Sequence, residues 1–264
     1  MPIRDMGYRP YKGVLLPHRG RYWAIARRVL AGAWSARMVK LILAGALFPM
    51  VGLGVAMYIK LKLEKLTGSS FKMDLDDADH LVFILYYWCQ LWFAFGLSQR
   101  VGAPAIADDI RTGAFSFYFS RPVSRAHYVA GKILPVALLV AMASTVPALL
   151  LCLFRLGIAS DGDDVWVALK LMGATLALTP FYLGIFAVLP VCLGALSGRS
   201  KAVQYLWSGV FFLSCIAGEG LAAAADEPML EALDAISLVA SWACEQLTVT
   251  AAAMAMPPAA AAAR

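Results

Sequence analysis

The sequence predicts an all-α, polytopic integral membrane protein, and three observations lead to this class. Hydrophobic residues make up 61% of the 264 residues, whereas charged residues make up only 15%. Soluble domains are closer to half apolar and a quarter charged. Long uncharged apolar segments recur along the chain, and Lys and Arg residues collect between them. Because only helices and closed barrels satisfy the backbone in lipid, we interpret each apolar segment as a helix.

Five apolar segments are predicted to span the membrane within a single domain. At about 1.5 Å per residue, residues 41–59 cover about 28 Å, close to the hydrocarbon thickness of about 30 Å. The five predicted spans are residues 41–59, 81–98, 133–154, 171–196 and 202–218. Proline residues predict kinks at Pro49, Pro135, Pro147, Pro180 and Pro190.

The C-terminal residues 248–264 are the candidate for a sixth span, which would bring the total to about six. This segment is short, rich in alanine and interrupted by Pro257 and Pro258. The run of five alanines before Arg264 suggests a truncated or incompletely assigned end, a hypothesis that intact-mass measurement tests.

The distribution of charge predicts a multi-pass protein of the plasma membrane with a cytoplasmic N-terminus. Residues 1–40 carry nine Lys or Arg and one acid, whereas residues 219–247 carry six acids and no base. Cytoplasmic loops are enriched in Lys and Arg. The net charge of +6 is therefore interpreted as a topology signal, not as a nucleic-acid-binding surface.

An amphipathic helix is predicted directly before the first span, within residues 1–40. Apolar residues such as Trp23, Val29 and Trp34 recur at helical spacing, with arginines such as Arg27 among them. This pattern is typical of a helix that lies in the membrane interface. A plain basic anchor that only sets topology is compatible with the same residues.

The chain lacks the motifs of several enzyme classes, so it is not expected to be an enzyme. No GxxxxGK[ST] motif and no HExxH motif occurs. The acidic residues Asp74, Asp76, Asp77 and Asp79 leave open a metal-dependent enzyme that modifies lipids, but we favour a solvated acidic loop and expect no metal site. The five cysteines form no CxxC pair and are interpreted as buried thiols.

No Asp, Glu, Lys or Arg falls within the five predicted spans. Ion-coupled carriers usually keep an ionisable residue at membrane depth, so energy from another source, or no transport at all, is expected. The polar residues that could line a pathway are Tyr87, Gln90, Thr175 and Thr179. Packing between helices is the commoner use of such residues.

Residues 107–132, here called the docking segment, place aromatic side chains on the predicted cytoplasmic side. Phe115, Phe117, Tyr118 and Phe119 lie within five positions, between the helix terminators Gly113 and Pro122. A short helix is therefore predicted between these two residues. Exposed aromatics are costly unless a partner or the bilayer covers them, and we favour a docked partner over an interfacial aromatic belt.

This segment resembles the signature that follows the second span of ABC-2 type transporter permeases. That signature has an acid, a Gly-Thr pair, an apolar short helix, Pro, a small residue, Arg and a final Gly-Lys. The matching residues here are Asp109, Gly113, the four aromatics, Pro122, Ser124, Arg125, Gly131 and Lys132. Asp109 replaces the usual Glu, and Ala114 replaces the usual Thr. The helix before the first span resembles the elbow helix of the family, and residues 219–247 resemble its outer re-entrant segment.

The resemblance implies the membrane-spanning subunit of an ATP-driven ABC transporter, most simply an exporter. A separate ABC ATPase would bind ATP and Mg²⁺, and this chain would hold no cofactor. The short helix would be the coupling helix, docking through the four aromatics with Asp109, Gly113, Pro122 and Arg125. A second permease copy and membrane lipid are the other expected partners. A non-transporting membrane anchor or assembly factor that docks a cytosolic protein is the alternative.

Overall fold

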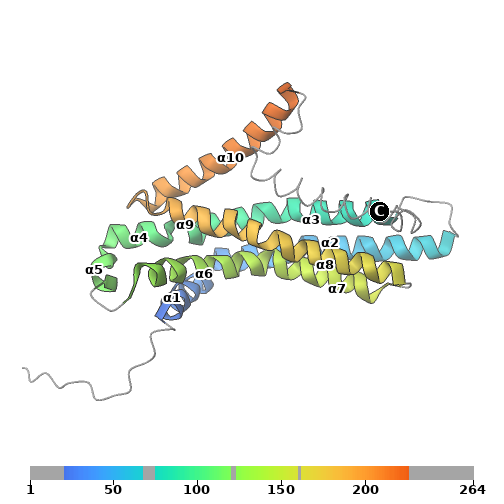
Figure 1. Cartoon of the computed structure of the whole chain (residues 1–264), viewed down its shortest axis with the longest axis horizontal. Coiled ribbons are helices and arrows are strands. Elements are labelled where there is room, and N and C mark those ends of the chain that lie inside the picture. The colour runs from blue at the N-terminus through green and yellow to red at the C-terminus, as the bar shows by residue number, and fades with distance from the viewer. Residues whose placement is uncertain (1–20, 68–74, 120–122, 160–161, 226–264) are drawn as a thin grey trace, which may run out of the picture.

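The computed structural model describes residues 21–67, 75–119, 123–159 and 162–225, and all regular structure in these ranges is helical. Figure 1 shows the long helices side by side along one axis. The elements are α1 Arg21–Ser35, α2 Arg37–Thr67, α3 Leu75–Leu97, the π-helical turn η2 Ser98–Gly102, α4 Pro104–Thr112, α5 Ala114–Phe119, α6 Arg125–Ala143, α7 Thr145–Gly157, α8 Gly162–Leu183, the π-helical turn η3 Gly184–Val188, α9 Leu189–Leu193 and α10 Ser200–Ala225.

The helices agree with the predicted membrane-spanning class. Among the described residues, three stretches are long and apolar enough to cross a bilayer, namely Arg37–Lys60, Arg125–Gly157 and Asp164–Leu193. The helices α3 and α10, of 23 and 26 residues, overlap the predicted second and fifth spans but are not among these three stretches, so these two spans remain predictions. The protein is therefore an all-α polytopic membrane protein.

Two of the predicted spans are irregular beside prolines, at Pro147 and Pro190, where kinks were predicted. The third span consists of α6 and α7, which meet at Ser144. Pro147 has no N–H to donate to the carbonyl of Ala143, so one helical hydrogen bond is missing beside this junction, although the N–H of Ala148 still donates to the carbonyl of Ser144. The fourth span contains the turn η3, and α9 follows it with Pro190 in its first turn. The helices α2, α6 and α8 continue through Pro49, Pro135 and Pro180.

The segment after the second span contains more helix than predicted. The chain leaves α3 through η2 and forms α4 before it reaches Gly113. Pro104 occupies the first turn of α4, where a missing N–H costs little. Gly113 ends the helix with a φ of 67°, a left-handed conformation that favours glycine. The short helix α5 follows, as predicted.

The helix α10 packs on the bundle through its first half. Trp207 is buried and donates a hydrogen bond to the Ser98 hydroxyl at 2.9 Å, and Phe211 stacks on Phe95 with ring centroids 4.2 Å apart. Figure 1 shows the helix rising away from the bundle beyond this contact. The first residues of the predicted re-entrant segment continue α10 to Ala225, and residues 226–264, including the candidate sixth span, lie outside the described residues.

The helix predicted before the first span is present as α1, which packs against α6. Ile25, Ala26 and Ala33 are buried on this side, whereas Trp23 and Trp34 are about half exposed. Gly131 of α6 allows the contact, because a Cβ there would lie 2.9 Å from both the Cβ of Ile25 and the carbonyl oxygen of Tyr22. The glycine of the Gly-Lys pair therefore allows α1 to pack closely against α6.

Candidate functional site

The docking segment folds as two short helices joined by a single left-handed residue. The N–H of Gly113 donates to the carbonyl of Ile110 at 3.2 Å, which closes the last turn of α4. The Thr112 hydroxyl donates to the carbonyl of Asp108 at 2.8 Å, and the Ser116 hydroxyl donates to the carbonyl of Gly113 at 2.9 Å. Local hydrogen bonds thus fix how α5 leaves α4.

A buried ion pair joins α4 to α6. The Nζ of Lys132 lies 2.6 Å from the Oδ2 of Asp109, and the two side chains are only 6% and 14% exposed. The Tyr128 hydroxyl donates to the same Oδ2 at 2.7 Å, and Lys132 also donates to the carbonyl of Ala105 at 2.8 Å. We call Asp109, Tyr128 and Lys132 the ionic anchor. Burial favours an ion pair only when extra hydrogen bonds satisfy it, and this pair has them.

Two of the four aromatics of the docking segment pack inward on the ionic anchor. The rings of Phe115 and Tyr118 lie 5.4 Å and 5.3 Å from the ring of Tyr128. The Nζ of Lys132 lies 6.0 Å from the Tyr118 ring centroid, within range of a cation–π contact. Burial raises the pKa of Tyr118 above its ordinary value of 10.0, and the charge of Asp109 adds to this effect. The neutral tyrosine is therefore favoured here.

The other predicted docking residues have different positions. Arg125 is exposed on the first turn of α6, after Ser124, whose hydroxyl accepts from the His127 N–H at 3.3 Å. Gly113 is exposed between the two helices. Phe117 and Phe119 belong to α5, but their side chains, like all of Pro122, lie outside the described residues. Asp109 faces the interior, so its geometry suits a supporting role better than direct contact with a partner.

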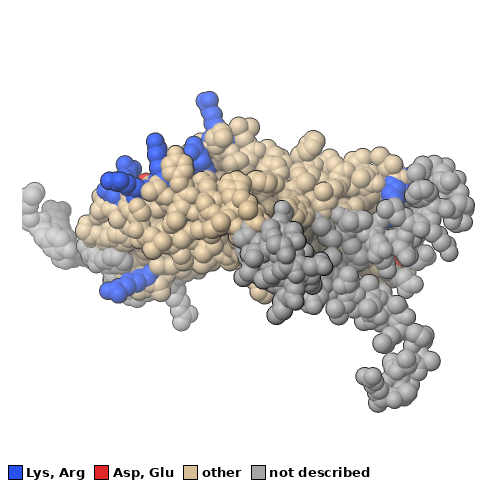
Figure 2. Space-filling model, turned by 90° about the horizontal axis from the view of Figure 1, so that it is seen from above, with Lys and Arg blue, Asp and Glu red and all other residues tan. Residues whose placement is uncertain are grey.

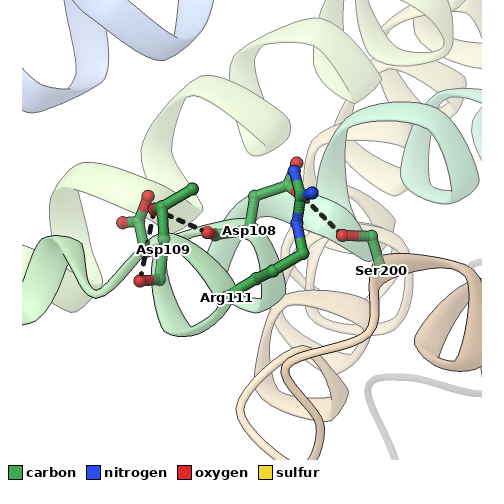
Figure 3. Close-up of polar contacts among 5 residues, drawn as sticks. Asp108, Asp109, Arg111 and Ser200 are labelled. Atoms are coloured by element: carbon green, nitrogen blue, oxygen red, sulfur yellow. Dashed lines mark hydrogen bonds and ion pairs between the residues drawn. The ribbon is translucent and has the colours of Figure 1, made fainter.

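The neighbouring residue Asp108 points away from the ionic anchor. Figure 3 shows its carboxylate directed toward Ser200 at the start of α10, and the Ser200 hydroxyl donates to its Oδ1. Arg111 lies 3.5 Å from the same oxygen in an exposed pair, which contributes little to stability. Adjacent carboxylates on α4 therefore connect this helix to α6 on one side and to α10 on the other.

The predicted pathway residues come together in the bundle interior. The Thr179 hydroxyl lies 3.3 Å from the Thr145 hydroxyl, and Thr175 lies 3.8 Å from the sulfur of Cys152. Tyr86 donates to the carbonyl of Ser144 at 2.6 Å, beside the break between α6 and α7. We call the whole group the interior polar cluster, and its members are Tyr86, Tyr87, Gln90, Ser144, Thr145, Thr175, Thr179 and Tyr182.

Most polar groups of the interior polar cluster are satisfied by hydrogen bonds within this chain. Gln90 is fully buried and donates to the carbonyl of Ala46 at 2.6 Å. Thr175 and Thr179 donate to carbonyls one turn earlier on α8, each at 2.9 Å. Two buried atoms, Oε1 of Gln90 and the Tyr182 hydroxyl, have no partner among the described residues. The four predicted residues thus pack helices together in this chain, and lining a pathway remains a prediction.

Sequence reasoning did not place Tyr128 in the site and assigned Lys132 only to the resemblance. The signal was an acid and a lysine on either side of a turn within one short segment. Spacing alone did not show that the chain returns so closely that the two side chains meet.

Among the described residues, no group of three or more His, Cys, Asp or Glu side chains could hold a metal ion. Asp74 and the side chains of Asp76, Asp77 and Asp79 lie outside them.

Exposed positive charge gathers at one end of the molecule. Figure 2 shows Lys and Arg side chains concentrated at the end that carries α1, α4 and α5. The exposed basic residues of this end are Arg27, Arg28, Arg37, Lys40, Arg100, Arg111, Arg125, Arg199 and Lys201. The docking segment therefore lies at a strongly basic end of an apolar bundle.

Residues 93–251 match the family model described as ABC-2 family transporter protein. The match covers more than half of the chain and includes the whole docking segment. The chain belongs to this family. No curated protein and no solved structure matches it at a significant level.

Membership in this family indicates which kind of subunit carries the ionic anchor and α5. An ABC-2 permease is the membrane-spanning subunit of an ABC transporter and is not itself the ATPase. It works with an ABC ATPase subunit. The resemblance drawn from the docking segment is confirmed, and the permease is a multi-pass membrane protein.

Proposed function

We propose that this permease exports its substrate and that α5 is the coupling helix, seated in a cleft of the ABC ATPase. The ATPase would supply the sites for ATP and Mg²⁺. Two permease copies, most simply identical, would enclose the pathway in the plasma membrane. Phe117 and Phe119 are the residues we assign to the docked surface of α5, with Arg125 beside them.

The observation that carries this proposal is the ionic anchor. A coupling helix transmits force only if it is attached firmly to a membrane-spanning helix. Asp109 lies four residues before Gly113, and its carboxylate holds Tyr128 and Lys132 of α6 at 2.7 Å and 2.6 Å. Phe115 and Tyr118 add aromatic packing between α5 and α6. A displacement of α5 would therefore move the start of the third span.

The proposed cycle follows from this attachment. ATP binding would bring two ATPase subunits together and move both α5 helices, and the ionic anchors would transfer the motion to both α6 helices. The hydrogen bond that Pro147 cannot donate would make the junction of α6 and α7 the point where the third span bends. The pathway between the copies would then open toward the outside.

Orientation is proposed from the basic end. Exposed Lys and Arg residues gather beside α5, and the positive-inside rule places such an end in the cytoplasm. An ATPase subunit that hydrolyses cytosolic ATP must meet the permease on that side. The first residue of α1 lies at this end, and we propose a cytoplasmic N-terminus.

The test is co-purification of the ABC ATPase with Phe117→Asp, using the full chain expressed in its own host. We expect the variant to insert normally and to lose the ATPase, since truncating one buried aromatic anchor typically costs about 2 kcal/mol or more. Leu196→Asp is the matched control, because Leu196 is 72% exposed and lies outside the docking segment. Retention of the ATPase by Phe117→Asp would refute the docking role of α5.

A further inference from the structure

The turn η2 deprives one backbone carbonyl of its usual hydrogen-bond donor. In an α-helix, the carbonyl of Gln99 would accept from the N–H of Ala103, four residues later. Here the Ala103 N–H donates to the carbonyl of Ser98 at 2.9 Å, which is the π-helical pattern. The next residue, Pro104, has no N–H to donate. The Gln99 carbonyl therefore needs a donor from outside its own helix.

The helix α10 supplies this donor. The Nε2 of Gln204 donates to the Gln99 carbonyl at 3.1 Å. In return, the Nε2 of Gln99 donates to the Gln204 carbonyl at 3.0 Å and to the Ser208 hydroxyl at 2.8 Å. We call Gln99, Gln204 and Ser208 the glutamine clasp. Apolar packing is non-directional, whereas these paired hydrogen bonds fix one register between η2 and α10.

The helix α4 is also held directly by the start of α10 and by the loop before it. Val203 of α10 is buried against Ala107 of α4. A Cβ at Gly198 would lie 3.1 Å from the Cγ2 of Ile110, so the loop lies close against α4. The hydrogen bond from α10 to the Asp108 carboxylate adds a polar contact (Figure 3). Both η2 and α4 are therefore attached to the first part of α10.

We propose that the glutamine clasp makes α10 a second helix through which motion of the docking segment reaches the membrane. This inference rests on the proposed coupling role of α5. The ionic anchor would carry the motion to α6, and the clasp, together with the contacts on α4, would carry it to α10. Gln99 and Gln204 would act as positioning residues, because they hold α10 to η2 in a fixed register.

The shape of α10 suits it to amplify a small motion. Its first part is held at η2, and Figure 1 shows the remainder rising away from the bundle. Ile216, on this remainder, is 69% exposed. It lies about 18 Å beyond Gln204 along the helix, so a tilt of about 10° at the clasp would displace it by about 3 Å. Such a displacement is measurable with spin labels.

The test is double electron–electron resonance on the full-length permease purified with its ABC ATPase, before and after trapping with ATP, Mg²⁺ and vanadate. Spin labels on genetically encoded keto residues replace Leu169 and Ile216 to report α10, or Leu169 and Val129 to report α6. All three side chains are exposed. Labelled copies are diluted with unlabelled copies, so that the distances lie within one chain. We expect trapping to change both distances, by about 3 Å for α10.

The deciding variant combines Gln99→Met with Gln204→Met, which removes both amides and retains unbranched side chains of similar length. We expect it to keep the ATPase and the change at α6, and to lose most of the change at α10. Tyr205→Met is the control, because Tyr205 adjoins Gln204 but is 74% exposed and lies outside the clasp. If the double variant does not assemble, Gln204→Met is compared with Gln204→Arg, which keeps an N–H donor and should keep the change at α10.

The outcomes separate this inference from the coupling role on which it rests. A wild-type complex in which α6 moves and α10 does not overturns the inference. So does a double variant in which α10 moves as far as in the wild type. If neither distance changes in the wild type while the ATPase stays bound, the coupling role of α5 fails together with the inference.

Discussion

The ionic anchor and the interior polar cluster are both buried, yet they handle polarity in different ways. The anchor holds full charges, and each is met by an opposite charge and a further hydrogen bond. The interior polar cluster contains only hydroxyl and amide groups, which mostly bond to backbone carbonyls of the same bundle. Charge is tolerated near the basic end, whereas neutral groups suffice deeper in the bundle. The difference predicts that disruption will be far more costly at the anchor.

The largest expected effect comes from removing one charge of the anchor. Asp109→Asn leaves the Lys132 ammonium buried without an opposite charge, and breaking a buried pair in this way typically costs about 3–5 kcal/mol. The double variant Asp109→Asn with Lys132→Met removes both charges and should recover most of the lost stability. Thermal unfolding in one detergent measures both variants. A single variant that unfolds like the wild type would show that the pair contributes little.

An intermediate effect is expected where α1 meets α6. Gly131→Ala places a methyl group 2.9 Å from the Cβ of Ile25 and from the carbonyl of Tyr22, and such overpacking typically costs about 1–3 kcal/mol. Gly173→Ala on α8 is the control, because a Cβ there meets nothing within 4 Å. Unfolding midpoints of the two variants should differ by several degrees. Equal midpoints would mean that α1 moves away from α6 without cost.

The smallest effect is expected within the interior polar cluster. Tyr86→Phe removes one hydrogen bond to the carbonyl of Ser144, which still accepts from the N–H of Ala148 at 3.2 Å. Hydrogen bonds between membrane helices average about 0.6 kcal/mol, so the unfolding midpoint should barely change. If Tyr86→Phe proved as destabilising as Asp109→Asn, the contrast between the two regions would be wrong.

Most helices of the fold were predictable from local sequence. The features that were not predicted are short irregular turns within or beside these helices. The apolar segments indicated where the long helices lie, and Gly113 indicated the turn before α5. The π-helical turns η2 and η3 were not predicted, because η3 lies within an apolar segment and the polar residues of η2 indicated only that the second span ends. Pro147 signalled the kink near Ser144, whereas the hydrogen bond from Tyr86 to the Ser144 carbonyl joins residues 58 positions apart and had no signal in the local sequence.

The candidate site was predictable as a segment but not as a geometry. The four aromatics were assigned one role, whereas Phe115 and Tyr118 pack inward on Tyr128. Asp109 was expected beside the partner, yet it lies in the interior with Lys132. A pattern of residues shows which side chains are unusual for their place, but it does not show which of them face one another.

The sequence by itself determined the class of this protein, its basic end and its family. Apolar length, charge distribution and a contiguous motif decide these properties, and all three are local. Only the tertiary structure decided that Asp109 and Lys132, twenty-three positions apart, form one buried pair. It also decided that Gln204 of α10 donates to the Gln99 carbonyl, which the turn η2 deprives of its usual donor. Both depend on the angles at which helices return past one another, and packing of side chains distant in sequence sets those angles.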